Sequence, residues 1–157
     1  MHSAIRAEMR QAFEEVYASY SYINGCKLET FEKAYAQISE TNFAFGVSNG
    51  LDALYLSLRA LEMGPGDEVV VPSNTFIATV LAVSRVGTTP VFVEPDIRTY
   101  NLNPELIEAS INSRTKAIIP VHIYGQACNM ESIMDIARRH GLYVVEDNAQ
   151  AHLASFQ

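Results

Sequence analysis

Three segments of the sequence carry side chains that could do chemistry, and each follows an apolar run of the kind that forms a buried strand. Ser48, Asn49 and Gly50 make up the first segment, Phe76 lies in the second, and Asp147 lies in the third. In open α/β sheets, ligands bind beyond the carboxyl ends of the strands. The three segments are therefore candidates for one shared binding site.

The first segment, VSNGLDAL (47–54), stands where a predicted strand turns into a helix. The free N–H groups of a helix N-terminus suit a phosphate, and Gly50 permits a close approach of the backbone to it. Ser and Asn are also ordinary N-cap residues. Taken alone, the segment therefore favours capping over phosphate binding.

The other two segments offer a flat surface and a charge. Phe76, in the first turn of its predicted helix, could stack on a flat ligand, although packing in the core is favoured for a lone aromatic. Asp147 ends an apolar strand, where a poorly solvated carboxylate needs a cationic partner. A protonated pyridinium nitrogen would be such a partner, and the aspartate would keep it protonated, so that the ring acts as an electron sink. The alternative for Asp147 is a helix cap, and Glu146, on the opposite side of the strand, is expected to be structural.

A phosphate cup, a stacking aromatic and a pyridinium-binding aspartate are together the parts of a pyridoxal phosphate site. Other sites find less support in the sequence, which contains neither G-x-G-x-x-G after a strand nor G-x-x-x-x-G-K-[ST]. His122 and His152 lack a nucleophile motif nearby and are expected to pack or to form hydrogen bonds. Cys26 and Cys128 lack metal-ligand spacing, so neither a metal site nor a disulfide framework is predicted.

Composition narrows the class of protein further. A length of 157 residues with 48% apolar content fits one globular domain with a proper core. The net charge of −7 argues against a nucleic-acid surface, which needs clustered Lys and Arg. No apolar run approaches the roughly 20 residues that cross a bilayer, and the charged N-terminus lacks a signal-peptide core. We therefore expect a cytoplasmic protein without a nucleic-acid or membrane partner.

Strands and helices alternate from residue 43 onward. Helices are predicted to begin near residues 51, 76, 104 and 130, and strands are predicted over 43–47, 68–73, 89–95, 116–125 and 142–147. This order indicates an α/β fold with a mainly parallel sheet and helices on both faces. Residues 1–42 are predicted to form a separate N-terminal helical arm, with helices over about 3–18 and 29–38 joined through a turn at Asn24-Gly25.

Four runs of the sequence closely resemble the DegT/StrS-type sugar aminotransferases, which are pyridoxal-phosphate enzymes of fold type I. They are SNGLDAL, GPGDEVVVPSNTFIATVLAVSRVGTTPVFVEPDIRTYNL, TKAIIPVHIYGQ and VVEDNAQAH, and the resemblance extends over residues 4–152. It implies that residues 43–157 are part of the cofactor-binding large domain, truncated before the small domain. The chain would then be about the first half of such an enzyme.

The resemblance also implies a role for each candidate residue toward pyridoxal 5'-phosphate. Gly50 and Leu51 would offer backbone donors to the phosphate of the cofactor. Phe76 would stack on one face of the pyridine ring, with Ala149 against the other face. Asp147 would pair with the ring nitrogen, and Gln150 would lie beside the ring hydroxyl.

Members of this family aminate nucleotide-linked keto sugars, usually with glutamate as the amino donor, and work as homodimers. The wording FVEPDIRTYNL (91–102) most resembles members that aminate carbon 3 of a dTDP-linked 3-keto-6-deoxyhexose. The resemblance therefore implies a nucleotide-sugar 3-aminotransferase of amino-sugar biosynthesis.

One departure from the family concerns the lysine that forms the Schiff base with the cofactor, which in the family lies a few dozen residues beyond the aspartate. The lysines of this chain are Lys27, Lys33 and Lys116, all before Asp147. No catalytic residue is therefore assigned, and we expect the chain to be inactive alone. Two alternatives stay open: a non-catalytic remnant or pseudoenzyme that pairs with a full-length relative, and a fragment of a related sugar dehydratase with histidine at the lysine position.

Overall fold

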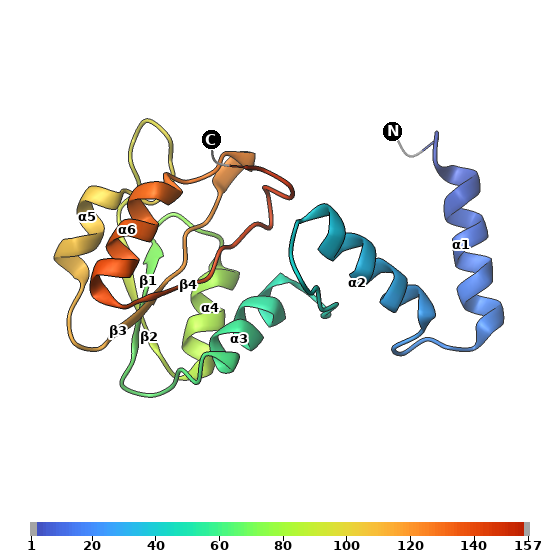
Figure 1. The fold of residues 1–157 in the computed structure, drawn as a ribbon, viewed down its shortest axis with the longest axis horizontal. Coiled ribbons are helices and arrows are strands. Elements are labelled where there is room, and N and C mark those ends of the chain that lie inside the picture. Colours follow the sequence, from blue (N-terminus) through green and yellow to red (C-terminus); the bar gives the residue numbers. More distant parts are fainter. Residues whose placement is uncertain (1–2, 156–157) are drawn as a thin grey trace. The chain divides into compact units, whose positions relative to one another are not determined.

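The computed structural model of the protein describes residues 3–155 and divides the chain into two compact units after Gly46 (Figure 1). The predicted boundary, after residue 42, falls slightly earlier in the chain. Residues 1, 2, 156 and 157, which the predicted regions include, lie outside the described part. The two units are described separately below.

The first unit contains two helices, α1 (Arg6–Ser19) and α2 (Cys26–Ile38). Helix α1 ends at Tyr20, whose backbone is left-handed with φ 56°, and Gly25 is the N-cap of α2. Both predicted helices are therefore present, but α1 begins three residues later than expected and α2 three residues earlier. Lys27 donates a hydrogen bond of 2.5 Å to Glu15, which joins the start of α2 to the last turns of α1.

The strand predicted over residues 43–47 is wrong, because this segment belongs to no strand. Its Gly46 N–H donates to the Glu32 carboxylate at 2.7 Å instead of to a neighbouring strand. Among the described residues, the sheet is built only from segments that follow residue 67. Alternating apolar residues indicate a strand only where a partner edge is within reach, and here a side chain takes the amide.

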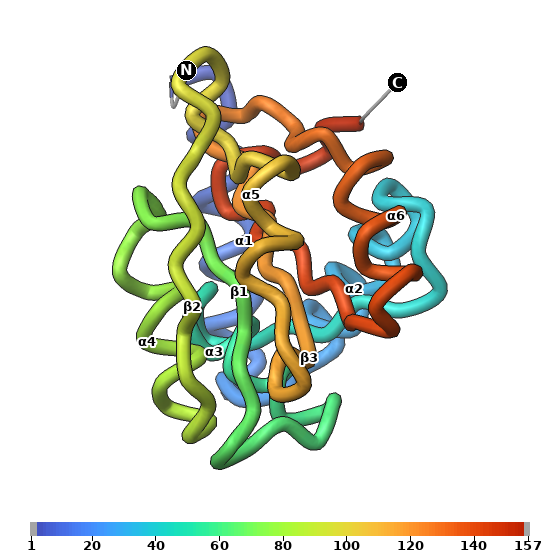
Figure 2. The backbone as a smooth tube through the Cα atoms, turned by 90° about the vertical axis from the view of Figure 1, so that its left-hand side faces the viewer, coloured from blue at the N-terminus to red at the C-terminus, as the bar shows by residue number. Residues whose placement is uncertain are grey.

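The second unit is built on a four-stranded parallel sheet with the order β2-β1-β3-β4 (Figure 2). Its strands are β1 (Glu68–Pro72), β2 (Thr89–Val93), β3 (Thr115–Ile118) and β4 (Tyr143–Val144). The central strand β1 is buried along its whole length, whereas β2 is an edge strand that is half exposed and contains Pro90, which lacks an N–H. The predicted α/β fold with a parallel sheet is confirmed.

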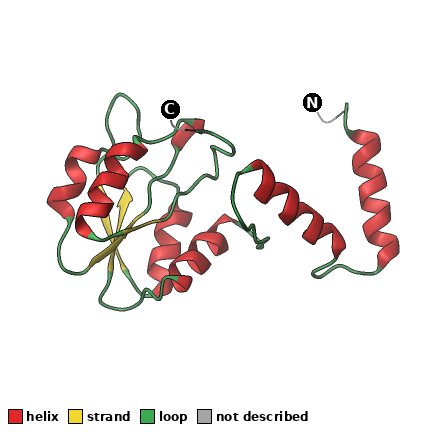
Figure 3. Cartoon of the chain, in the orientation of Figure 1, coloured by secondary structure: helices red, strands yellow, loops and turns green. Residues whose placement is uncertain are grey.

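Helices cover both faces of this sheet (Figure 3). Val69 and Val71 face one core with α3 (Gly50–Ala60) and α4 (Ile77–Val86). Val70 faces the other core with α5 (Pro104–Ser110) and α6 (Met130–His140). Successive side chains of a strand point to opposite faces, so one apolar run supplies both cores.

The helix boundaries follow their capping residues. Asn49, Asn103 and Asn129 accept hydrogen bonds from backbone N–H groups at the starts of α3, α5 and α6. Gly87 and Gly141 end α4 and α6 in the left-handed conformation, with φ values of 92° and 65°. The strands between these helices are all parallel, so their carboxyl ends lie at one edge of the sheet.

The two later strands are shorter than predicted. The strand β3 ends at Ile118, Pro120 follows it, and the short 3₁₀ turn η1 (Ile123–Gly125) comes next. Between Pro120 and η1, Val121 forms a parallel bridge with Asp147, so the segments after β3 and β4 pair again. The Asp147 N–H donates to the Pro120 carbonyl at 2.9 Å, and the Asp147 carbonyl accepts from His122 N–H at 3.2 Å. The backbone of Asp147 is therefore held by the neighbouring strand segment.

Candidate cofactor site

A cavity of about 620 Å³ lies at the carboxyl ends of the strands in the second unit. Its walls come from the start of α3, the segment between β1 and α4, the segment after β3 and the segment after β4. The structure brings all six predicted site residues into this one cavity: Gly50, Leu51, Phe76, Asp147, Ala149 and Gln150.

At the α3 end, the cavity meets backbone N–H groups that lack partners. The Asn49 side chain accepts from Asp52 N–H at 2.9 Å, and the Asn49 carbonyl accepts from Ala53 N–H at 3.0 Å. Within residues 3–155, no hydrogen bond involves the N–H groups of Gly50 and Leu51, as expected for the first turn of a helix. A Cβ built on Gly50 would meet no protein atom within 4 Å, so the space beside it is open.

The acidic residue in the first turn of α3 is already paired. Ser48 Oγ donates to the Asp52 carboxylate at 2.5 Å, Asn49 Nδ2 donates at 3.1 Å, and Arg85 lies 3.0 Å away. The hydrogen bond from Ser48, followed by the charge of Arg85, lowers the pKa of Asp52. Arg85 also lies over the ring of Tyr55, 4.9 Å from its centre. The negative charge at this helix end is therefore balanced, which leaves the N-terminus suited to an anion.

Phe76 is not a core residue, and the prediction favoured for it as a lone aromatic is wrong. Its side chain is 78% exposed, and it lines the cavity instead. It is also the N-cap of α4 rather than a member of the first turn, with an extended backbone at φ −63° and ψ 141°. Because the residue is exposed, a flat face of its ring remains available to a ligand.

Asp147 is half-buried, and each of its carboxylate oxygens accepts one hydrogen bond. Thr79 Oγ1 donates to Oδ2 at 2.9 Å, and Ala149 N–H donates to Oδ1 at 3.2 Å. The carboxylate oxygens offer about four acceptor sites, so further acceptor capacity remains at the cavity. The helix cap that was the alternative for Asp147 does not form within the described residues, because the Ala149 bond spans only a local turn and residues 148–155 contain no helix.

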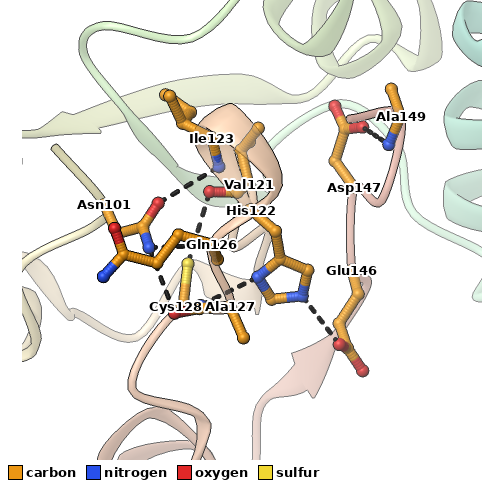
Figure 4. A network of polar contacts seen from close by, with 10 residues as sticks. All are labelled: Asn101, Val121, His122, Ile123, Gln126, Ala127, Cys128, Glu146, Asp147 and Ala149. Carbon is orange, nitrogen blue, oxygen red and sulfur yellow. Dashed lines mark hydrogen bonds and ion pairs between the residues drawn. The ribbon is translucent and has the colours of Figure 1, made fainter. Parts of the chain in front are cut away.

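The buried His122 and the exposed Glu146 form a hydrogen bond on the other side of the same strand segment (Figure 4). Cys128 N–H donates to His122 Nδ1 at 3.0 Å, so the imidazole proton is on Nε2, which faces Glu146 Oε2 at 2.9 Å. This hydrogen bond lowers the pKa of Glu146, and burial opposes the shift. These hydrogen bonds connect the segment that carries Asp147 to the segment after β3.

Gln150 reaches the cavity from the turn after Asp147 and contacts the turn after β3. Its Oε1 accepts from Tyr124 N–H at 2.9 Å. Since an N–H can only donate, the amide oxygen faces Tyr124, and the amide NH₂ group is left to donate to a ligand. Tyr124 is left-handed, with φ 58°, and precedes Gly125 with φ 80°. Residues held in this region cluster at binding sites.

Sequence reasoning overlooked several residues of this site. Asn74, Thr75, Thr79 and Tyr124 also line the cavity. The segment SNTFIAT carried a signal for Asn74, Thr75 and Thr79, because polar residues between a strand end and the first turn of the next helix lie at the same edge as Phe76. Tyr124 carried no such signal, since a left-handed tyrosine is not indicated by its residue type.

Among residues 3–155, no three His, Cys, Asp or Glu side chains come together as a metal site, and no helix is long and apolar enough to span a membrane. Cys26 is exposed and Cys128 is buried, both as free thiols.

Comparison with known proteins identifies the family. The sequence model of the DegT/DnrJ/EryC1/StrS aminotransferase family matches residues 3–157. The chain is 54% identical over 149 residues to the dTDP-3-amino-3,6-dideoxy-alpha-D-galactopyranose transaminase of Aneurinibacillus thermoaerophilus, an alignment that covers 95% of this chain and 41% of that protein. The chain belongs to the DegT/DnrJ/EryC1/StrS aminotransferase family.

Solved structures agree with this assignment. The crystal structure of S. venezuelae DesV in complex with a ketimine intermediate matches with a TM-score of 0.94 at 50% identity, covering 96% of this chain and 41% of that one. The structure of ntda from Bacillus subtilis with bound cofactor pmp matches with a TM-score of 0.90 at 37% identity, covering 92% and 33%. The chain thus spans between a third and about two fifths of the length of these relatives.

Proposed function

We propose that this chain supplies the cofactor-binding part of a pyridoxal-phosphate-dependent aminotransferase that acts on a nucleotide-linked keto-deoxysugar. The observation that carries the proposal is the convergence of Gly50, Phe76, Asp147 and Gln150 on one cavity from three separate segments. Each offers a group that matches a different part of the cofactor. A site for an unrelated ligand would not need this combination of an anion cup, a flat face and a carboxylate.

The donor set fits the cofactor at both ends. The free N–H groups of Gly50 and Leu51 point to an anion at the start of α3, and Gly50 leaves open space there. At the other end, Asp147 would hold a proton at the ring nitrogen, because a carboxylate in a poorly solvated site favours a charged partner. When bound, the protonated ring supplies an electron sink to the substrate chemistry.

The remaining residues would orient the ring. Phe76 would cover one face of it and exclude water there, since its exposed ring lines the cavity. Ala149 has a small side chain that would leave room at the opposite face. Gln150 would donate its amide N–H to the ring hydroxyl oxygen, because Tyr124 occupies the amide oxygen.

Substrate and assembly are proposed from the relatives and the resemblance. The Aneurinibacillus relative is named for a dTDP-linked 3-amino-3,6-dideoxy sugar, and we propose a substrate of that class with glutamate as the amino donor. A homodimer is proposed because the first unit exposes large apolar side chains on both of its helices, among them Met9, Phe13 and Phe31. The remnant and dehydratase alternatives are not favoured by any contact of the site.

The test uses pyridoxamine 5'-phosphate as the ligand, because it lacks the aldehyde that would react with the three lysines of the chain. Isothermal titration calorimetry should detect binding to the 157-residue chain. Asp147→Asn should weaken it by about 10- to 100-fold, the size of a hydrogen bond between charged groups. Glu131→Gln makes the same change on the exposed surface of α6 and should leave the affinity unchanged. Absence of binding, or equal loss in both variants, would contradict the proposed cofactor site.

A further inference from the structure

Thr79 is a buried polar residue whose hydroxyl meets the cofactor-facing carboxylate. It lies in the first turn of α4, its side chain is 1% exposed, and it borders the cavity. Its Oγ1 lies 2.9 Å from Asp147 Oδ2, although the two residues are 68 positions apart in the chain. The same Oγ1 lies 2.9 Å from Thr75 Oγ1. Two hydroxyls therefore form a row that ends on Asp147.

The direction of the hydrogen bonds in this row follows from counting hydrogens. A hydroxyl has one hydrogen to donate, and an ionised carboxylate can only accept. The hydrogen of Thr79 must therefore point to Asp147 Oδ2. Thr79 then has only lone pairs left for its neighbour, so the hydrogen between the two hydroxyls belongs to Thr75. The row runs in one direction, from Thr75 through Thr79 to Asp147.

This arrangement constrains the carboxylate on both sides. Thr79 holds Oδ2 and the Ala149 N–H holds Oδ1, so rotation of the carboxylate about its own bond would break at least one of the two hydrogen bonds. These two hydrogen bonds therefore fix the directions of the lone pairs of the carboxylate that remain free to accept. A carboxylate held in this way needs no reorganisation when a cationic ring nitrogen arrives.

We propose that Thr79, oriented by Thr75, is a positioning residue that holds the Asp147 carboxylate toward the ring nitrogen of the cofactor; this rests on the proposed function of the cavity. Thr79 does not need to touch the ring nitrogen itself. Its effect passes through Asp147, as the outer partners of metal-binding side chains act through the ligands they orient.

The chain contains a matched control for a purely structural role. Thr88 is also buried, at 5% exposure, but its hydroxyl donates to the Val83 carbonyl at 2.8 Å. Thr88→Val and Thr79→Val each replace a hydroxyl group with a methyl group at a similarly buried position. Both should lower the free energy of unfolding, but only Thr79→Val removes a hydrogen bond from Asp147.

The experiment measures the affinity of the full 157-residue chain for two ligands by calorimetry. One is pyridoxamine 5'-phosphate, and the other is its 1-deaza analogue, in which a C–H group replaces the ring nitrogen. Thr79→Val should weaken the first by about 10-fold, at the lower end of the range for outer partners of ligating groups. It should not change affinity for the second, which makes no bond to Asp147. Thr79→Ser, which keeps the hydroxyl, should restore wild-type affinity, and Thr88→Val should affect neither ligand.

Thr75→Val provides a second test that leaves the Thr79 hydroxyl in place. It should weaken binding of pyridoxamine 5'-phosphate by about threefold, because a donor in a row of hydrogen bonds strengthens the next one. This variant decides the matter if Thr79→Val does not fold. Equal losses for both ligands in these variants, or no loss for either, would overturn the positioning role.

Failure of the proposed function has a different outcome. If the wild-type chain binds neither ligand, the cavity is not a cofactor site and both proposals fall together. If Asp147→Asn weakens pyridoxamine 5'-phosphate and Thr79→Val does not, the cofactor site stands and the role of Thr79 is overturned.

Discussion

The two ends of the cavity are built in different ways. At the α3 end, the hydrogen bonds of the cap are local, since Asn49 caps Asp52 three residues away and Ser48 reaches Asp52 four residues away, although the ion pair of Asp52 with Arg85 comes from a more distant segment. At the Asp147 end they connect distant segments, because Thr79 is 68 residues from Asp147 and Gln150 is 26 residues from Tyr124. The cap at the α3 end can therefore form whenever its helix forms, whereas the hydrogen bonds at the Asp147 end need the folded sheet.

This difference predicts which variants damage one end alone. A change at the α3 end should lower the stability of that helix and leave the Asp147 end intact. A change in the long-range contacts should alter the fold or the Asp147 end without affecting the cap of α3. The following variants test this separation, beginning with the largest expected effect.

Asn101→Ala should be the most damaging change for stability. Asn101 is 3% exposed, and its side chain donates to the carbonyls of Gln126 and Ala127 and accepts from Ile123 N–H (Figure 4). Losing it leaves buried backbone groups without partners, so we expect a loss of about 3 kcal/mol in the free energy of unfolding. Urea denaturation measures it. Asn103→Ala, which removes only the local cap of α5, should cost about 1 kcal/mol. If Asn101→Ala cost no more free energy of unfolding than Asn103→Ala, the long-range contacts would not stabilise the fold more than the local cap does.

Gln150→Glu should separate the two functions of the Gln150 amide. The variant keeps an acceptor for Tyr124 N–H but has no N–H to donate into the cavity. We expect an affinity for pyridoxamine 5'-phosphate about 10-fold lower, the size of one hydrogen bond, with an unchanged thermal midpoint. Gln126→Glu adds the same charge on an exposed side chain and is the control. Unaltered binding to Gln150→Glu would mean that the amide donates nothing to the ligand.

Asn49→Ala tests the local end. Loss of the cap should lower the free energy of unfolding by about 1 kcal/mol, whereas Asn49→Ser, which keeps a capping oxygen, should cost only a few tenths. The ratio of affinities for pyridoxamine 5'-phosphate and its 1-deaza analogue should stay the same, because this ratio reports on the Asp147 end alone. A changed ratio in the calorimetric titration would show that the two ends are coupled.

The pH dependence of stability should show the smallest effect. The hydrogen bond from His122 lowers the pKa of Glu146 in the folded state below its ordinary 4.5. A lowered folded pKa means that the stabilisation is present above pH 4.5 and is lost as pH falls through the folded value. Thermal midpoints from neutral pH down to about pH 3 should therefore fall less steeply in Glu146→Gln than in the wild type. Parallel curves would rule out this contribution.

Most of the fold followed from local patterns. Apolar runs of four to six residues predicted the central strands, and Asn and Gly residues at the helix ends predicted the caps of α3, α5 and α6. The exception, residues 43–47, had the right residue types but no strand beside them. A strand depends on its neighbour, which its own residues do not specify.

For the site, residue types and chain order were sufficient to gather Gly50, Phe76 and Asp147, because the carboxyl ends of parallel strands meet at one edge, whereas Gln150 was predicted only from the family resemblance. Their individual states were not predictable in this way. The exposure of Phe76 depends on the backbone turn that precedes α4, and the orientation of the Gln150 amide depends on the left-handed Tyr124. The hydroxyl row that ends on Asp147 joins α4 to the segment after β4. Local sequence determines where helices begin and which groups lie at strand ends, whereas contacts across many residues need the closed sheet, since only folding brings their partners within hydrogen-bond distance.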